Sequence, residues 1–195
     1  MDLFYANLTP TQQLKKFKED AMHHFNIEDS TKFKVLKGLP KHFGNCVLFL
    51  LSHVPSRGFL KGRNDKLLTD SIKHFDITNH AITYAYLKPS LNVSRKDLKA
   101  CTGDMNLILS IVRPKLIVLV GENPGELFFG RKPKVVDVHG TIVGSIDKIP
   151  LVSTFDMLYY KEKTGYEDER YKRHIYEGDW NFIREQYKGA INANV

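Results

Sequence analysis

Two short, uninterrupted apolar runs constrain this chain more than any other feature. Residues 47–51 read Val-Leu-Phe-Leu-Leu, and residues 116–120 read Leu-Ile-Val-Leu-Val. Apolar runs of this length without polar alternation are typical of strands that are buried on both faces of a parallel sheet. Such a sheet needs helices on both sides, because each of its faces has to be covered.

Helical patterns surround these runs. Thr9, followed by Pro10 and Gln12, predicts a helix start with a capping box, and Ser94 with Asp97 predicts another. Apolar residues then recur at helical spacing over residues 14–25, 67–75 and 98–112, and a last helix is expected around residues 180–187. Further strands are expected at about 76–86 and 150–154. The alternation predicts a three-layer α/β/α fold with a central, mainly parallel, four-stranded sheet.

The length and charge of the chain limit its organisation and its partners. At 195 residues it fits one domain, with a core over about residues 46–160 and the N-terminal helix and C-terminal tail packed on it. Lysine and arginine number 29 against 22 acidic residues, a net charge of +7. This excess favours a polyanionic partner such as nucleic acid, or less often an anionic membrane.

Other sequence features favour an intracellular protein, in the cytoplasm or nucleoid, or in a host cell if the protein is viral. The two cysteines, Cys46 and Cys101, give no disulfide framework, and the start of the chain lacks the pattern of a signal peptide. No apolar run approaches the length of a membrane span. Of the two polyanionic partners, DNA is expected and a membrane is not. The common phosphate-loop, dinucleotide, zinc-protease and nucleophile-turn motifs are absent from the sequence, which disfavours those classes of enzyme.

A basic, glycine-containing loop follows the first apolar run and leads into a predicted helix. It is expected to contact phosphates through four side chains: Arg57, Lys61, Arg63 and Lys66. In α/β proteins a loop at this position commonly holds a ligand. The alternative is an ordinary strand-to-helix turn with a solvated basic surface.

Several segments, in one order over about residues 46–160, resemble the uracil-DNA glycosylase superfamily, most closely its iron–sulfur-bearing bacterial and archaeal branch. Residues 52–68 are similar to its first motif, a buried strand followed by Gly-Glu-x-Pro-Gly, a Phe-containing loop and a Leu-Leu helix. Residues 76–79, Asp-Ile-Thr-Asn, are similar to its Tyr-Ile-Thr-Asn strand end. Residues 99–121 look like its long helix and following strand, and residues 149–155 resemble the approach to its last motif.

This resemblance implies a fold that holds a flipped base in a pocket. Asn79 matches the side chain that reads the uracil edge, and Phe59 or Leu60 matches the aromatic residue that stacks on the base. Met157 and Leu158 follow the last motif, where the superfamily carries a loop that wedges into the duplex. Without the resemblance, Asn79 is a common turn residue, and the apolar residues are ordinary packing or the start of an amphipathic helix.

The sequence departs from the superfamily at the residues that carry out its chemistry. His53 aligns with the catalytic acidic residue, and Asp156 aligns with the histidine that steadies the departing base, where a carboxylate would repel the anion. Of the four cluster cysteines only Cys101 remains, so no cofactor is expected.

These departures lead us to expect a DNA-binding protein that acts in replication or repair and has weak, altered or lost glycosylase activity. Its role would be to recognise DNA or to tether a replication or repair protein. One alternative is an active glycosylase for uracil or a modified base, in which His53 is a general base oriented by Asp156. Another is a protein-interaction module without DNA binding, which the positive charge disfavours.

Overall fold

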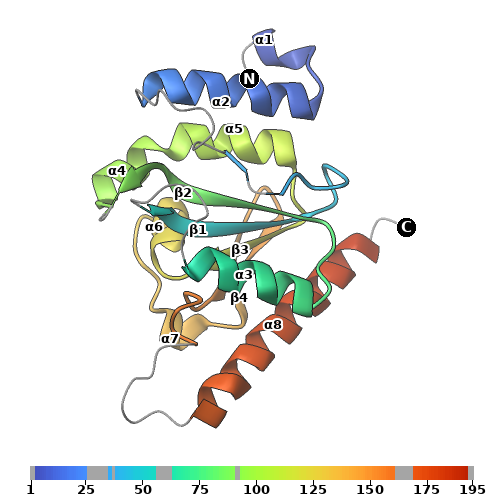
Figure 1. Cartoon of the computed structure of the whole chain (residues 1–195), viewed down its shortest axis with the longest axis vertical. Coiled ribbons are helices and arrows are strands. Elements are labelled where there is room, and N and C mark those ends of the chain that lie inside the picture. The colour runs from blue at the N-terminus through green and yellow to red at the C-terminus, as the bar shows by residue number, and fades with distance from the viewer. Residues whose placement is uncertain are drawn as a thin grey trace.

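The computed structural model describes residues 3–25, 35–36, 38–55, 63–90, 93–160 and 169–192 (Figure 1). Its helices and strands alternate along most of the chain. Their bounds, in chain order, are α1 Leu3–Ala6, α2 Pro10–His24, β1 Val47–Pro55, α3 Arg63–His74, β2 His80–Ser90, α4 Arg95–Ala100, α5 Thr102–Val112, β3 Leu116–Val120, α6 Asn123–Phe129, α7 Val135–Val138, β4 Thr141–Ile146, β5 Ile149–Thr154 and α8 Glu169–Asn192.

The strands form one sheet in the order β2-β1-β3-β5-β4. The first four in this order run parallel to one another, and β4 runs antiparallel to β5 at the edge. The predicted α/β class with a mainly parallel sheet is confirmed, but the predicted number of four strands is wrong.

The strand that the sequence pattern missed is β4, and it lacks both of the usual signals. Its six residues are exposed or only partly buried, so no apolar run marks it. The two-residue turn to β5 consists of Asp147 and Lys148, which both have positive φ, 47° and 68°. Turns of this kind usually contain glycine or asparagine, so this pair gives no sequence signal for a hairpin.

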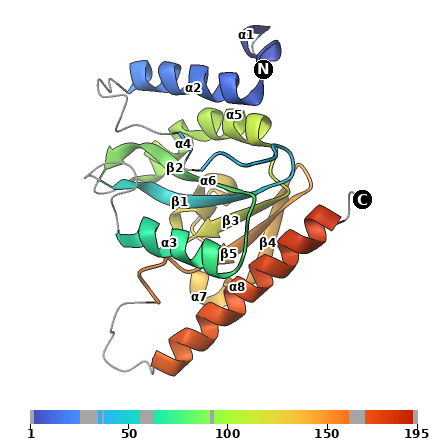
Figure 2. The ribbon, with the colours of Figure 1, turned by 45° about the vertical axis from the view of Figure 1, so that its right-hand side comes forward.

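Helices cover both faces of the sheet. Figures 1 and 2 show α5 on one face and α3 and α8 on the other, with α2 lying outside α5. The buried residues of α2, which include Leu14, Phe17 and Ala21, lie on one side of the helix, as their spacing predicted. The N-terminal helix therefore packs on the domain through α5.

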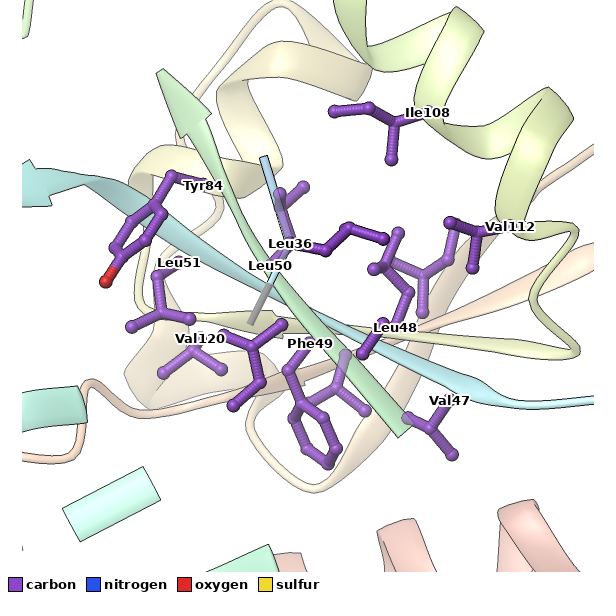
Figure 3. Close-up of a cluster of buried hydrophobic side chains, with 14 of the residues drawn as sticks. Leu36, Val47, Leu48, Phe49, Leu50, Leu51, Tyr84, Ile108, Val112 and Val120 are labelled. Atoms are coloured by element: carbon purple, nitrogen blue, oxygen red, sulfur yellow. The ribbon is translucent and has the colours of Figure 1, made fainter. Parts of the chain in front are cut away.

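The core lies around β1 and β3 (Figure 3). Residues 47–50 of β1 and all of β3 are buried, as expected for central strands of a parallel sheet. On one face the indole of Trp180 stacks between two other rings, with centroids 5.7 Å from Phe49 and 5.5 Å from Phe75. This stack ties α8 to β1 and to Phe75, the residue that follows α3.

Both predicted capping boxes are confirmed. The Thr9 side chain accepts from the Gln12 backbone and Ser94 accepts from the Asp97 backbone, and in each case the second side chain bonds back to the capping residue. The helix predicted over residues 98–112 is interrupted. It is split into α4 and α5 at Cys101, where the backbone has φ −87° and ψ 3°.

Candidate functional site

The carboxyl ends of β1, β3 and β5 meet along one side of the sheet, here called the carboxyl edge (residues 52–53, 121–123 and 154–156). Parallel α/β sheets bind ligands beyond such an edge. Asn123 Nδ2 donates to Ser52 Oγ at 2.6 Å, which joins the start of α6 to β1. Gly121 has φ +84°, and a Cβ atom there would lie 3.6 Å from the Asp156 Cβ. The segments that leave the three strands are thus packed together.

The structure places His53 and Asp156 at this edge, on either side of β3: His53 is in β1, and Asp156 comes two residues after β5. His53 pairs with Tyr86 inside the sheet, and its side chain is not among those described. Because β3 lies between β1 and β5, two strand spacings, about 10 Å, separate the two backbones. A His53–Asp156 contact would have to reach across β3, and it stays a prediction.

The Asp156 carboxylate has a role in the local turn. Its Oδ1 accepts from the Leu158 backbone N–H at 3.0 Å, and its carbonyl oxygen accepts from the Tyr159 N–H at 3.0 Å. Asp156 is partly buried. It therefore shapes the turn after β5.

Asn79 lies at the opposite, amino edge of the sheet, just before β2 begins. Its Oδ1 accepts from the His42 N–H at 3.1 Å, and its Nδ2 donates to the carbonyls of His42 and Asn45 at 2.9 and 2.6 Å. It is 6% exposed. The side chain thus holds the loop before β1, and the structure does not bring it together with His53 and Asp156. A role in reading a base would require these bonds to break.

The remaining predicted residues are divided between described and undescribed parts of the chain. Lys66 is exposed near the start of α3, whereas for Arg63 only the backbone is described. Met157 is 2% exposed and belongs to the core, and Leu158 is partly exposed. Four predicted residues lie outside the described ranges: Arg57, Phe59, Leu60 and Lys61.

A basic segment that the sequence analysis did not single out folds back beside the carboxyl edge. Three of its residues are exposed: Arg131, Lys132 and Lys134. Between them Pro133 packs on Gly125 in the first turn of α6, where an added Cβ would lie 2.5 Å from two ring carbons of the proline. Because α6 starts at the carboxyl edge, this contact brings the 131–134 segment next to it. In the sequence, the Arg-Lys-Pro-Lys run at residues 131–134 was the signal that could have pointed to this basic segment.

A buried carboxylate forms a second feature that the sequence did not reveal, here called the Asp179 network. Asp179 is 2% exposed, and its Oδ1 lies 2.7 Å from His139 Nδ1. Its Oδ2 accepts from Thr154 Oγ1 and from Tyr160 Oη, both at 2.9 Å. Thr154 is the last residue of β5, so the network lies at the carboxyl edge. Burial, and then the Asp179 charge, raise the pKa of Tyr160, which keeps its hydroxyl as a donor.

The amino edge carries a separate hollow of about 830 Å³. It lies between the loops that precede β1 and β3 and the turn between β4 and β5. Three basic residues line it: Arg113, Lys115 and Lys148. The two edges of the sheet therefore carry comparable sets of basic residues on opposite sides.

No helix in the described ranges has the length and apolar character that crossing a membrane requires. Cys46 and Cys101 are both buried with free thiols. Among the described residues no three side chains of His, Cys, Asp or Glu lie close enough to share a metal ion. Neither the protein-family models nor the curated protein sequences with which the chain was compared give a match.

Proposed function

We propose that this protein binds DNA along the carboxyl edge of its sheet, and that it is a member of the uracil-DNA glycosylase superfamily with weak, altered or lost glycosylase activity. The observation that supports this most is the exposed 131–134 segment, which Pro133 and Gly125 hold beside that edge. The net charge of +7 agrees with a polyanionic partner. Lys66 is a further exposed basic residue, near the start of α3, the helix that follows β1.

The chemistry of the edge supports binding over cleavage. Breaking the bond between uracil and its sugar puts positive charge on the sugar and negative charge on the departing base. A protonated His53 would disfavour the first charge and an ionised Asp156 would disfavour the second. Losing one such stabilising group costs on the order of 10²-fold in rate. Asn79, which is bonded into the loop before β1, supplies no free base-reading amide in this structure.

The alternative is an active glycosylase with altered catalytic groups, and one observation favours it. His53 lies near the end of β1 and Asp156 just after β5, the two strands that neighbour β3, so a substrate held over the end of β3 could contact both residues. In that case neutral His53 would act as the general base.

An excision assay on labelled uracil-containing duplex DNA, run beside a binding titration on the same DNA, tests the proposal. We expect binding with little or no uracil release at neutral pH. The double variant His53→Glu with Asp156→His should release more uracil, because it restores the charges that the reaction needs. Brisk release by the unaltered protein, abolished by His53→Ala, would establish the active glycosylase instead. Absence of DNA binding would refute both versions.

A further inference from the structure

The imidazole of His139 is fixed in position by two independent contacts. Its Nδ1 lies 2.7 Å from the buried Asp179 carboxylate, and its ring packs on Phe155 with centroids 4.8 Å apart. Phe155 in turn stacks on Tyr159 at 4.0 Å. His139 also ends α7, and its backbone N–H donates to the Val135 carbonyl. Little freedom is left to this side chain.

One atom of this fixed ring remains without a role. The His139 side chain is 28% exposed, and none of the described residues forms a hydrogen bond with its Nε2. A carboxylate can only accept a hydrogen bond, so in the contact with Asp179 the proton belongs to Nδ1. Nε2 is then an acceptor in the neutral ring and becomes a donor only when the ring is protonated.

A basic segment, residues 131–134, precedes the short helix that ends at His139, and its charge would attract an anionic ligand. Lys134 stands at the start of α7 and His139 at its end, five residues apart and about 8 Å along a helix axis. Arg131 and Lys132 precede Lys134, and both are exposed.

Charged and titratable groups stand on the elements around the ring in the described part of the chain. From α8 come Asp179 and Lys172, and the Lys172 Nζ lies 4.9 Å from the Tyr159 ring. From the turn after β5 come Tyr159 and Tyr160, and α7 itself carries the exposed Asp137.

We infer that His139 binds a phosphate of the DNA backbone. In this arrangement the imidazolium donates Nε2–H to a non-bridging phosphate oxygen while Asp179 holds Nδ1–H. Forming the complex at neutral pH therefore takes up a proton. The inference rests on the proposed DNA binding and adds to it a phosphate contact that depends on pH.

The test is the affinity for a fluorescent DNA duplex between pH 6 and pH 8 at constant ionic strength. The Nε2–H donor is lost when the ring loses its proton, so affinity should fall by about threefold to tenfold over this range. Calorimetry in buffers of different ionisation enthalpy should show uptake of up to one proton at pH 7.5. The His139→Gln variant keeps an amide donor that does not titrate, so it should bind with a flat pH profile and no proton uptake.

A matched control is His74→Gln. His74 is exposed at the end of α3, on the amino edge, and should keep the pH dependence of the unaltered protein. Thermal unfolding of His139→Gln establishes that the variant is folded. If the unaltered protein binds DNA without proton uptake, or if His139→Gln keeps the pH profile, the inference is wrong and the proposed function stands. If no DNA binds at any pH, both fail.

A parallel titration with inorganic phosphate distinguishes two sources of the anion. Proton uptake with the duplex, but not with phosphate at the same concentration of phosphate groups, supports a DNA backbone contact. Equal uptake with inorganic phosphate alone would overturn the assignment to DNA.

Discussion

The stack around Trp180 allows a prediction that separates two effects of burial: the gain from packing a large side chain, and the cost of burying an N–H group that has no acceptor. Trp180 is fully buried between Phe49 and Phe75, so Trp180→Ala removes a large side chain from the contact between α8 and the sheet. Large-to-small changes of this kind cost about 3–5 kcal/mol of unfolding free energy. At about 2–4 °C per kcal/mol for a chain of this size, the melting temperature should fall by roughly 6–20 °C.

Trp180→Phe should behave differently. The indole Nε1–H is buried and has no hydrogen-bond partner among the described residues, a cost of about 1–3 kcal/mol. Phenylalanine removes this donor and keeps a stacked ring, so the relief offsets most of the lost contact area. We expect the unfolding free energy of Trp180→Phe to lie within about 1.5 kcal/mol of the unaltered protein.

Urea and thermal unfolding, followed by circular dichroism, measure both variants. Tyr171→Ala is the matched control, because Tyr171 lies on the same helix and is 56% exposed. Its effect should stay within about 0.5 kcal/mol. If Trp180→Phe proves as destabilising as Trp180→Ala, the reasoning about the unpartnered indole is refuted. If Trp180→Ala costs under about 1 kcal/mol, the stack does not anchor α8.

Three further predictions concern other parts of the fold. Gly125→Ala should lower the unfolding free energy by about 1–3 kcal/mol, because the added Cβ would meet Pro133. Gly103→Ala, which lies in α5 with open space around it, should raise the unfolding free energy by about 0.4–1 kcal/mol. Urea unfolding measures both, and equal effects would contradict the reasoning. Burial raises the pKa of Cys46 to about 12, so its thiol should resist alkylation at pH 8, and stability should decrease as pH rises from about 9 towards 12; fast alkylation of folded protein would speak against it. Asn79→Ala should cost about 1–3 kcal/mol and leave DNA affinity unchanged, and lost affinity with intact stability would return Asn79 to the ligand site.

Most of the core could be predicted because its strands are buried on both faces. A short apolar run with no polar alternation is typical of a strand with both faces buried. Residues 47–51 and 116–120 therefore predicted β1 and β3. The helix starts at Thr9 and Ser94 were equally clear, because capping depends on side chains only three residues apart. Local signals of this kind do not require knowledge of the tertiary structure.

The features that the sequence did not reveal depend on distant contacts. β4 is recognisable only by its pairing with β5, since its own residues are partly polar and its turn lacks glycine. The Asp179 network joins residues 25 and 40 positions apart. Asn79 was placed by motif similarity, but the side of the sheet on which it lies is decided by where β2 begins. Sequence spacing alone carries no information on these points.

The most direct test of the central claim compares two variants that lose the same charge on opposite edges of the sheet. One has glutamine at the three basic residues of the 131–134 segment beside the carboxyl edge: Arg131, Lys132 and Lys134. The other has glutamine at the three basic residues of the amino-edge hollow: Arg113, Lys115 and Lys148. The measurement is the affinity for duplex DNA at several salt concentrations, with thermal unfolding to establish that both variants are folded.

Each phosphate contact contributes about 0.9 to the slope of log affinity against log salt concentration. The carboxyl-edge variant should therefore bind more weakly, with its slope reduced by about 2–3, while the amino-edge variant keeps nearly the full slope. The opposite ranking would place DNA on the other side of the sheet. Equal and small losses in both variants would contradict binding along the carboxyl edge.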